Sequence, residues 1–346
     1  MHSIRMFYLL VICCGVATVC SHSRRTLSSR NFEPHSQPLK PFGSAPSWEL
    51  DPPIAHGGDR GELSFDFARS LKLANLAAVS QCQPHRIANW TCTRCWHIPD
   101  FQDASVNHDL ERELLAFTGW LPSLNSAIVV FRGTDRGSLS NWLADLRGWQ
   151  TDFDLPWPRA EGCRVHSGFF GAYNASTLRP FVSHNVERLL EAHEGAPVTV
   201  VGHSLGGALA SLCAAELAAG HLVPGRSPEV HLMTLGSPRV GNEAFAEFVD
   251  RAVSSSLRVT HMNDVVPSLP IRAMGFHHLR REVWLADIRF ETQRFFSSPV
   301  QVPVVCDGSG EDPLCHAGQC TLGLCTSVYN HVHGYFGLFM GQSESC

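Results

Sequence analysis

The chain has 346 residues, of which 44% are hydrophobic and 17% are charged. This composition is typical of a globular protein rather than a disordered one, and the length allows a sizeable core in one large domain or two small ones. The formal net charge of −5 predicts no basic face, so nucleic acid is not expected as a partner.

The N-terminal residues have the features of a secretory signal. Arg5 is followed by an apolar run over 6–20 that ends in small residues. We therefore expect a signal peptide over 1–20, cleaved near Cys20 or Ser21. A membrane anchor is the alternative, but a spanning helix needs about 20 apolar residues. No other segment is long and apolar enough, so we expect a mature chain without a transmembrane anchor, secreted or in the lumen of a secretory organelle.

The cysteine content fits an oxidising compartment. The ten cysteines after the signal are Cys82, Cys92, Cys95, Cys163, Cys213, Cys306, Cys315, Cys320, Cys325 and Cys346. An even number in a secreted chain favours disulfides, although the sequence does not define the pairing. Cys213 lies in an apolar helical segment and would fit a buried free thiol, which would leave a second cysteine unpaired. Cys92 and Cys95 have zinc-ligand spacing, but no second pair lies nearby, so we expect no metal. Sequons at Asn89 and Asn174 predict glycosylation.

The segment after the signal differs in composition from the rest of the chain. Residues 21–60 are rich in Ser, Pro, Arg and Gly and have no apolar period, which predicts a propeptide or a flexible linker. A single catalytic domain is expected over 61–346. Its first helix is predicted within 62–80. The apolar stripe expected on that helix consists of Phe65, Ala68, Leu71 and Leu76.

Short apolar strands and helical segments alternate through the centre of the chain. The clearest strands are at 126–131, 197–202, 230–235 and 257–262. Helical patterns lie at 177–193, 207–219 and 242–253. This alternation predicts an α/β fold with a mainly parallel central sheet flanked by helices. The final segment is irregular and rich in Cys, and we expect disulfides to hold it.

Ser204 is the strongest candidate for a catalytic residue. GHSLG at 202–206 matches G-x-S-x-G, in which a strand ends at a sharp turn and a helix begins. The turn strains the serine backbone, and glycines on both sides allow close packing. The helix N-terminus directs free N–H groups toward the site of attack, so the N–H of Leu205 is an expected oxyanion donor. The alternative is an ordinary glycine turn.

Hydrolases with this elbow supply the acid and then the histidine later in the chain. Asp264 follows the strand at 257–262, at the sheet edge where ligands bind, and is the expected acid. Its alternative role is a turn residue before Pro267. Asp250 lies within a predicted helix and Asp287 follows a later strand, so both fit less well.

His331 and His333 are the candidates for the base. Either imidazole could accept the serine proton at one ring nitrogen while Asp264 holds the other. Most histidines have no such role, and this chain has 19. His331 and His333 are selected as candidates because they follow Asp264 in the chain, as the order serine, acid, histidine requires.

Eight stretches, in order, resemble the class 3 lipases, which are fungal-type secreted triacylglycerol lipases. They are VVFRGT (129–134), NWLADL (141–146), VHSGFF (165–170), VGHSLGGALA (201–210), TLGSPRVGN (234–242), NDVVPSLP (263–270), GFHHLRREVWL (275–285) and TSV-x-NH…YFG (326–337). The chain departs from the family at Asn330, where an Asp usually precedes the histidine. The resemblance implies an α/β-hydrolase fold and an enzyme that needs neither a cofactor nor a metal.

The resemblance also assigns roles to individual residues. It implies that Ser204 is the nucleophile and Asp264 the acid. Thr134 corresponds to the residue that completes the oxyanion hole with its backbone and hydroxyl donors. The match at TSV-x-N favours His331 as the base, with His333 as the alternative.

An amphipathic segment follows Thr134. Its apolar positions are spaced i, i+3, i+4 and i+7, and they are Leu139, Trp142, Leu143 and Leu146. A permanently buried core helix would have the same pattern. In the family this segment is the lid, whose apolar face covers the site in water and contacts lipid when it opens.

The resemblance therefore implies a triacylglycerol lipase that acts through an acyl-enzyme, with lipid at an oil–water or membrane surface as its partner. A phospholipase, a monoacylglycerol lipase or a feruloyl or other carbohydrate-ester esterase could share the frame. The leucine and tryptophan stripe favours acyl chains over feruloyl groups. A non-catalytic lipid-binding homologue is the remaining alternative, although the expected serine, acid and base are all present.

Overall fold

The computed structural model describes residues 65–134, 149–153, 161–288, 291–292, 295–296, 300–320, 325–342 and 346. All of them belong to one compact unit, Asp51–Cys346. The expected signal peptide at 1–20, the expected linker at 21–60 and the expected start of the domain lie outside the described residues. So do the expected lid residues Leu139, Trp142, Leu143 and Leu146. These assignments stay predictions.

Within the described residues, an eight-stranded sheet forms the centre, with the order β1-β2-β3-β6-β7-β8-β9-β12. These strands are Gln102–Asp109 (β1), Leu114–Leu121 (β2), Ser126–Phe131 (β3), Val198–His203 (β6), Val230–Leu235 (β7), Ser255–His261 (β8), Glu282–Ile288 (β9) and Val300–Val305 (β12). β3 and β6 to β9 run parallel, whereas the pairs β1–β2, β2–β3 and β9–β12 are antiparallel, with β1 and β12 at the two edges. The predicted α/β fold with a mainly parallel sheet is confirmed, including its four clearest strands.

Three short two-stranded sheets lie outside the central one, as far as the described residues show. They pair Gln150–Asp152 (β4) with Arg164–His166 (β5), Glu291–Thr292 (β10) with Phe295–Phe296 (β11), and His333–Tyr335 (β13) with Leu338–Phe339 (β14).

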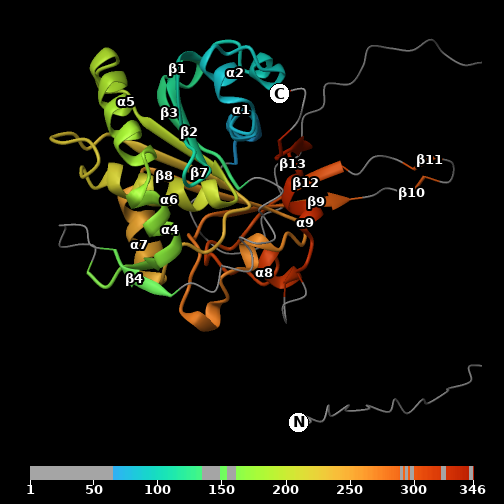
Figure 1. The fold of residues 1–346 in the computed structure, drawn as a ribbon. Coiled ribbons are helices and arrows are strands. Elements are labelled where there is room, and N and C mark those ends of the chain that lie inside the picture. Colours follow the sequence, from blue (N-terminus) through green and yellow to red (C-terminus); the bar gives the residue numbers. More distant parts are fainter. Residues whose placement is uncertain are drawn as a thin grey trace, which may run out of the picture. The chain divides into compact units, whose positions relative to one another are not determined.

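Helices cover both faces of the central sheet (Figure 1). On one face pack Ser167–Ala175 (α4), Leu178–Ala192 (α5), Leu205–Ala218 (α6) and Glu243–Ala252 (α7). On the other lie Phe67–Val79 (α1), Pro84–Ala88 (α2) and the 3-10 helix Thr93–His97 (η1). The remaining helices are Pro122–Leu124 (η2), Val266–Ser268 (η3), Arg272–Met274 (η4), His316–Gln319 (α8) and Val328–Val332 (α9). None of the described helices is long and apolar enough to span a bilayer.

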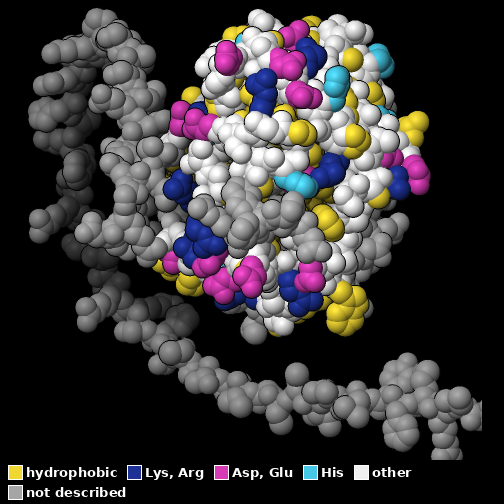
Figure 2. All heavy atoms as spheres, turned by 90° about the vertical axis from the view of Figure 1, so that its left-hand side faces the viewer, with side chains coloured by type: hydrophobic (Ala, Val, Ile, Leu, Met, Phe, Trp, Pro, Cys, Tyr) yellow, Lys and Arg dark blue, Asp and Glu magenta, His cyan; other side chains and the backbone are white. Residues whose placement is uncertain are grey.

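The outer surface of α4, α5 and α7 is polar. Basic and acidic side chains are interspersed on this side of the molecule (Figure 2). One such pair is Arg251–Glu247, with its nitrogen and oxygen 3.3 Å apart. The apolar sides of these helices face the sheet, which is the amphipathic pattern expected of surface helices.

The first helix is where it was predicted, and its buried face was predicted in part. Ala68 is exposed, whereas Ser70, Leu73, Ala74 and Ala77 are buried. Of the other predicted stripe residues, Leu76 is buried, Leu71 is partly buried and Phe65 lies before the start of the helix. The residues that face the sheet follow steps of three and four.

The cysteines form four disulfides within the described residues: Cys82–Cys346, Cys92–Cys95, Cys306–Cys315 and Cys320–Cys325. Three of these bonds hold the irregular C-terminal segment, as expected. Cys213 is a buried free thiol, and Cys163 is the second unpaired cysteine. The two do not share an element, since Cys163 precedes β5 and Cys213 lies in α6.

Both sequon asparagines are accessible. Asn89 ends α2 and Asn174 lies near the end of α4, and both are exposed. Their glycosylation stays a prediction.

Candidate active site

Ser204 lies at the junction of β6 and α6. Its φ of +58° and ψ of −130° put it in a sparsely populated region for a residue with a side chain. Its N–H donates to the carbonyl of Leu235 at the end of β7, with 2.9 Å between nitrogen and oxygen. The neighbouring strand thus fixes the strained turn.

The glycines around Ser204 are required by packing. A Cβ on Gly202 would collide with the carbonyl oxygen of Gly206, and a Cβ on Gly206 would collide with that of Phe131. The start of α6 therefore crosses β6 and β3 at backbone contact. This explains why the elbow needs glycine two positions before and two positions after the serine.

Asp264 follows β8 and is completely buried. Its Oδ1 accepts from the N–H of Val266 at 2.9 Å, and its Oδ2 accepts from the Tyr335 hydroxyl at 2.6 Å. Burial raises the pKa of this carboxyl, but the charge of His331 and the hydrogen bonds from His331, Tyr335 and Val266 outweigh it. The net effect holds the Asp264 pKa below its usual value, so the group is a carboxylate near neutral pH.

His331 contacts this carboxylate. Its Nδ1 lies 3.0 Å from Oδ1 and 2.9 Å from Oδ2 of Asp264. The ring of His333, the alternative base, instead stacks on Tyr329 with centroids 4.5 Å apart and packs against Phe339. The end of α9 at Val332 separates the two histidines and turns them to different surroundings. Of the two candidates, the geometry favours His331.

Gly236 brings the serine and the acid–base pair together. It follows Leu235, which accepts the Ser204 N–H, and has a φ of +55°. A Cβ there would lie 3.0 Å from Asp264 Oδ2 and 3.1 Å from His331 Nδ1. Only a glycine allows the carboxylate and the imidazole to pack this close to the chain beside Ser204.

The expected oxyanion donors flank Ser204. Leu205 is the first residue of α6, so its N–H is among those that a helix cannot satisfy internally. Thr134 follows β3, and the adjacent Gly133 packs against the serine, since a Cβ there would lie 3.0 Å from Ser204 Cβ. Within the described residues, the buried Ser204 Oγ, Thr134 Oγ1 and His331 Nε2 have no hydrogen-bond partner. Buried polar atoms usually have one, so these atoms are free to engage a substrate.

Three further histidines hold the backbone of this site, and the sequence reasoning did not find them. His203 Nε2 lies 2.9 Å from the carbonyl oxygen of His331, and His261 Nδ1 lies 3.0 Å from that of Asn330. His316 Nε2 lies 2.7 Å from the carbonyl oxygen of Asp264. The sequence offered only their positions as a signal. His203 precedes the nucleophile, His261 ends β8 and His316 lies in the Cys-rich segment.

The other two carboxylates considered for the acid have different partners. Asp250 Oδ1 accepts from the Ser256 hydroxyl at 2.8 Å, and its Oδ2 accepts from the N–H of Arg280. Asp287 in β9 lies 3.2 Å from His261 Nε2.

Two groups of potential metal ligands occur among the described residues. His316 lies with Cys320 and Cys325, and Asp312 lies with Cys306 and Cys315. In both groups the two sulfurs are joined in a disulfide. A disulfide offers no thiolate, so neither group fits a metal ion.

Comparisons with known proteins agree with this geometry. Residues 128–274 match the family described as lipase (class 3). A lipase from Rhizomucor miehei is 32% identical over 289 residues, which are 82% of this chain and 72% of that lipase. A secreted mono- and diacylglycerol lipase from Fusarium solani is 32% identical over 232 residues, covering 62% of this chain and 63% of the relative.

Solved structures give the same result. The triacylglyceride lipase of Rhizomucor miehei is similar with a TM-score of 0.65 at 28% identity, covering 80% of this chain and 96% of that one. A triacylglycerol lipase whose catalytic centre is described as a serine protease triad has a TM-score of 0.63 at 29% identity, covering 82% and 98% of the two chains.

The fold and the site define a serine hydrolase of the α/β-hydrolase class. Within that class, the chain belongs to the class 3 lipase family. The expectation of a secreted protein agrees with the names of the Fusarium and Penicillium relatives, which are secreted lipases.

Proposed function

We propose that the protein is a lipase that hydrolyses the carboxylic ester bonds of acylglycerols through an acyl-enzyme on Ser204. The observation that carries this proposal is the buried Asp264–His331 pair, 2.9 Å apart, beside a serine on a strained elbow. A charged carboxylate behind an imidazole fixes its tautomer and stabilises the imidazolium that forms during acyl transfer.

The reaction has two half-reactions. As Ser204 Oγ bonds to the ester carbonyl carbon, His331 Nε2 accepts the hydroxyl proton, and the N–H groups of Leu205 and Thr134 with the Thr134 hydroxyl stabilise the oxyanion. The carbonyl–alkoxy bond then breaks, and His331 returns the proton to the departing alcohol. In the second half, water gives a proton to His331 and attacks the acyl-enzyme, which releases the fatty acid and restores Ser204.

The names of the relatives support acylglycerols as the substrate class. The Rhizomucor miehei structure is a triacylglyceride lipase, whereas the Fusarium and Penicillium relatives are mono- and diacylglycerol lipases. Rates on mono-, di- and triacylglycerol therefore identify the number of acyl chains on the preferred substrate.

Exposed apolar residues that follow the expected lid and the Asp264 loop in the sequence support action at a lipid surface. Trp149 is 84% exposed and directly follows the segment that carries the expected lid. Ile271 and Met274, which follow the Asp264 loop, are 51% and 40% exposed. Gln150 joins the two regions, because its side-chain amide donates to the carbonyl of Met274 at 3.3 Å. Together they provide an apolar edge that lipid could cover.

The experiment compares initial rates on emulsified long-chain triacylglycerol, diacylglycerol, monoacylglycerol and phosphatidylcholine with the rate on a soluble short-chain ester. The Ser204→Ala variant is the control for each substrate. We expect activity on acylglycerols that rises sharply above the solubility limit and vanishes in Ser204→Ala. Activity on the soluble ester alone would assign the protein to the esterases, and a preference for phosphatidylcholine would make it a phospholipase. Trp149→Ser tests the apolar edge, since it should slow emulsion hydrolysis but leave the soluble ester unaffected.

A further inference from the structure

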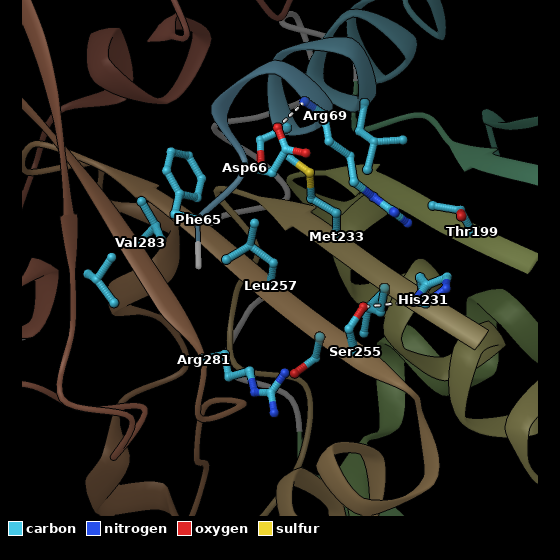
Figure 3. A pocket seen from close by; sticks show the side chains of 15 residues that line it. Phe65, Asp66, Arg69, Thr199, His231, Met233, Ser255, Leu257, Arg281 and Val283 are labelled. Atoms are coloured by element: carbon cyan, nitrogen blue, oxygen red, sulfur yellow. Dashed lines mark hydrogen bonds between the residues drawn. The ribbon is translucent and has the colours of Figure 1, made fainter. Parts of the chain in front are cut away.

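A cavity lies between α1 and the sheet, with a volume of about 300 Å³ (Figure 3). Its walls include the second residues of β6 and β7, Thr199 and His231, and the first residue of β8, Ser255. Ser204 and Asp264 follow the last residues of β6 and β8. Because these strands are parallel, the cavity and the candidate active site lie at opposite ends of the sheet.

One corner of the cavity is cationic. The Arg69 side chain extends from the first turn of α1 toward His231 and Thr199 (Figure 3). Its guanidinium has no hydrogen bond or ion pair within the described residues, although the residue is half-buried. Asp66 is the one acid among the described lining residues, and its Oδ1 already accepts the Arg69 backbone N–H at 2.9 Å. A partly desolvated guanidinium without an acceptor favours an anionic ligand.

His231 sets the chemistry of the same corner. Its Nδ1 lies 2.8 Å from the Ser255 hydroxyl. Burial and the charge of Arg69 hold the pKa of His231 below its usual value, although the exposed Glu229 carboxylate, 3.5 Å from Nε2, opposes them, so the ring is neutral near pH 7. A neutral imidazole does not compete with Arg69 for an anion.

Apolar side chains form one wall of the cavity, while Ser70, Ser256 and Arg281 add polar groups to the remaining lining. The apolar wall is formed by Phe65, Leu73, Met233, Leu257, Val283 and Val305. In Figure 3 Phe65, Leu257 and Val283 lie across the cavity from His231. One cationic corner and a long apolar wall match a ligand with one anionic head and a hydrocarbon tail.

We propose that this cavity binds one fatty-acid anion, with its carboxylate at Arg69 and its tail along Leu257 and Val283. The choice of a fatty acid rests on the proposed function, because ester hydrolysis of acylglycerols releases this anion next to the protein. Arg281, at the exposed edge of the cavity, adds a second positive charge that attracts the carboxylate. The protein would thus hold its own product at a site remote from Ser204.

The test measures binding of radiolabelled dodecanoate to the full chain by equilibrium dialysis after Ser204 has been blocked with diethyl p-nitrophenyl phosphate. We expect one saturable site per chain. Arg69→Gln should raise the dissociation constant roughly tenfold or more, because a charge-assisted hydrogen bond is lost. Arg188→Gln is the matched control, since it lies on α5 on the other face of the sheet, and should bind as tightly as the wild type. Dodecanoylglycerol, which has no charge, should bind weakly and be insensitive to Arg69→Gln.

A second readout uses dodecanoate with a photoreactive group at the end of its tail. The label should be found on β8 and β9 in the wild type and be suppressed by unlabelled dodecanoate. No saturable binding, equal affinity in Arg69→Gln and Arg188→Gln, or labelling only of other segments would overturn the proposal. If Ser204 does not react with the phosphate ester, that result counts against the proposed hydrolase, and binding is then measured on the Ser204→Ala chain.

Discussion

The imidazole of His203 stacks on that of His331, with ring centroids 4.6 Å apart, while its Nε2 lies 2.9 Å from the His331 carbonyl oxygen. Burial and the charge of His331 lower the pKa of His203 to about 3, so its ring is neutral and Nε2–H donates to that carbonyl. The residue before the proposed nucleophile therefore holds the residue proposed as the base. This contact couples the elbow to the C-terminal segment.

Removing this contact should impair catalysis more than binding. In His203→Ala we expect kcat on a soluble ester to fall about tenfold, because the base loses its support, with KM nearly unchanged. His203→Gln, which keeps a donor, should recover part of the loss. His221→Ala, in an exposed turn, is the control. If His203→Ala and the control have equal kcat and KM, His203 does not position His331.

The two candidate bases are separated by substitution. His331→Ala and Asp264→Asn should each lower kcat by roughly 10⁴, because the imidazole is lost or held in the wrong tautomer. His333→Ala should keep most of the activity, since that ring stacks on Tyr329. Steady-state kinetics on one soluble ester compare all three, and a large loss in His333→Ala alone would reverse the assignment.

Tyr335 supports the acid through its hydroxyl. Tyr335→Phe removes the 2.6 Å hydrogen bond to buried Asp264 and should lower the free energy of unfolding by about 1.5–3 kcal/mol, with a loss of kcat. Urea unfolding measures the change in the free energy of unfolding, and kinetics on a soluble ester measure the loss of kcat. Tyr329→Phe is the matched control, because Tyr329 is 68% exposed and should tolerate the change.

Acid should destabilise the fold through its buried histidines. Burial lowers the pKa of His203, His278 and His316, so between about pH 6.5 and the lower folded-state pKa the unfolded chain binds more protons. Stability is therefore full above about pH 6.5 and falls as pH decreases, by at most about 1.4 kcal/mol per pH unit for each histidine. Asp264 has a lowered pKa, so its contribution is lost only below about pH 3.9.

Urea unfolding at pH 7 and pH 4.5 checks this dependence. His203→Gln, which cannot be protonated, should lose less free energy of unfolding between the two pH values than the wild type. Identical losses in the two proteins would mean that His203 is protonated in the folded state.

The two unpaired cysteines give a chemical test of the disulfide pattern. Burial raises the pKa of Cys163 and raises that of Cys213 further. We expect no reaction of the native protein with a disulfide reagent such as Ellman's reagent, because neither a thiol nor a thiolate is accessible. In a chain without the expected signal peptide, which carries Cys13, Cys14 and Cys20, two thiols should react after unfolding in denaturant without reductant. A different number would show another pairing.

Sequence patterns were sufficient for the parts of the fold that depend on near neighbours. The β-branched strand before Ser204 and the glycines around it are local features, and they predicted β6, the elbow and α6. The parallel sheet followed from the alternation of strands and helices. On the buried face of α1, Leu76 is buried as predicted, whereas Ala68 was assigned incorrectly, because its side chain is small enough to lie on either side of a helix.

Features that join distant residues could not be predicted. The contacts of His203 with His331 and of His316 with Asp264 span 128 and 52 residues of sequence. No period or motif marks such pairs, because a histidine suits the surface, the core and a catalytic site equally well. The same holds for the cavity under α1, because Arg69 lies in α1 and His231 lies far along the chain in β7.

The Cys82–Cys346 disulfide has a mechanical consequence. It ties residues 264 positions apart, so every element from α2 to β14 lies inside one covalent loop. A force that pulls the chain before α1 away from Cys346 would pass through the sulfur atoms and unwind α1, while the strands of the central sheet carry no load.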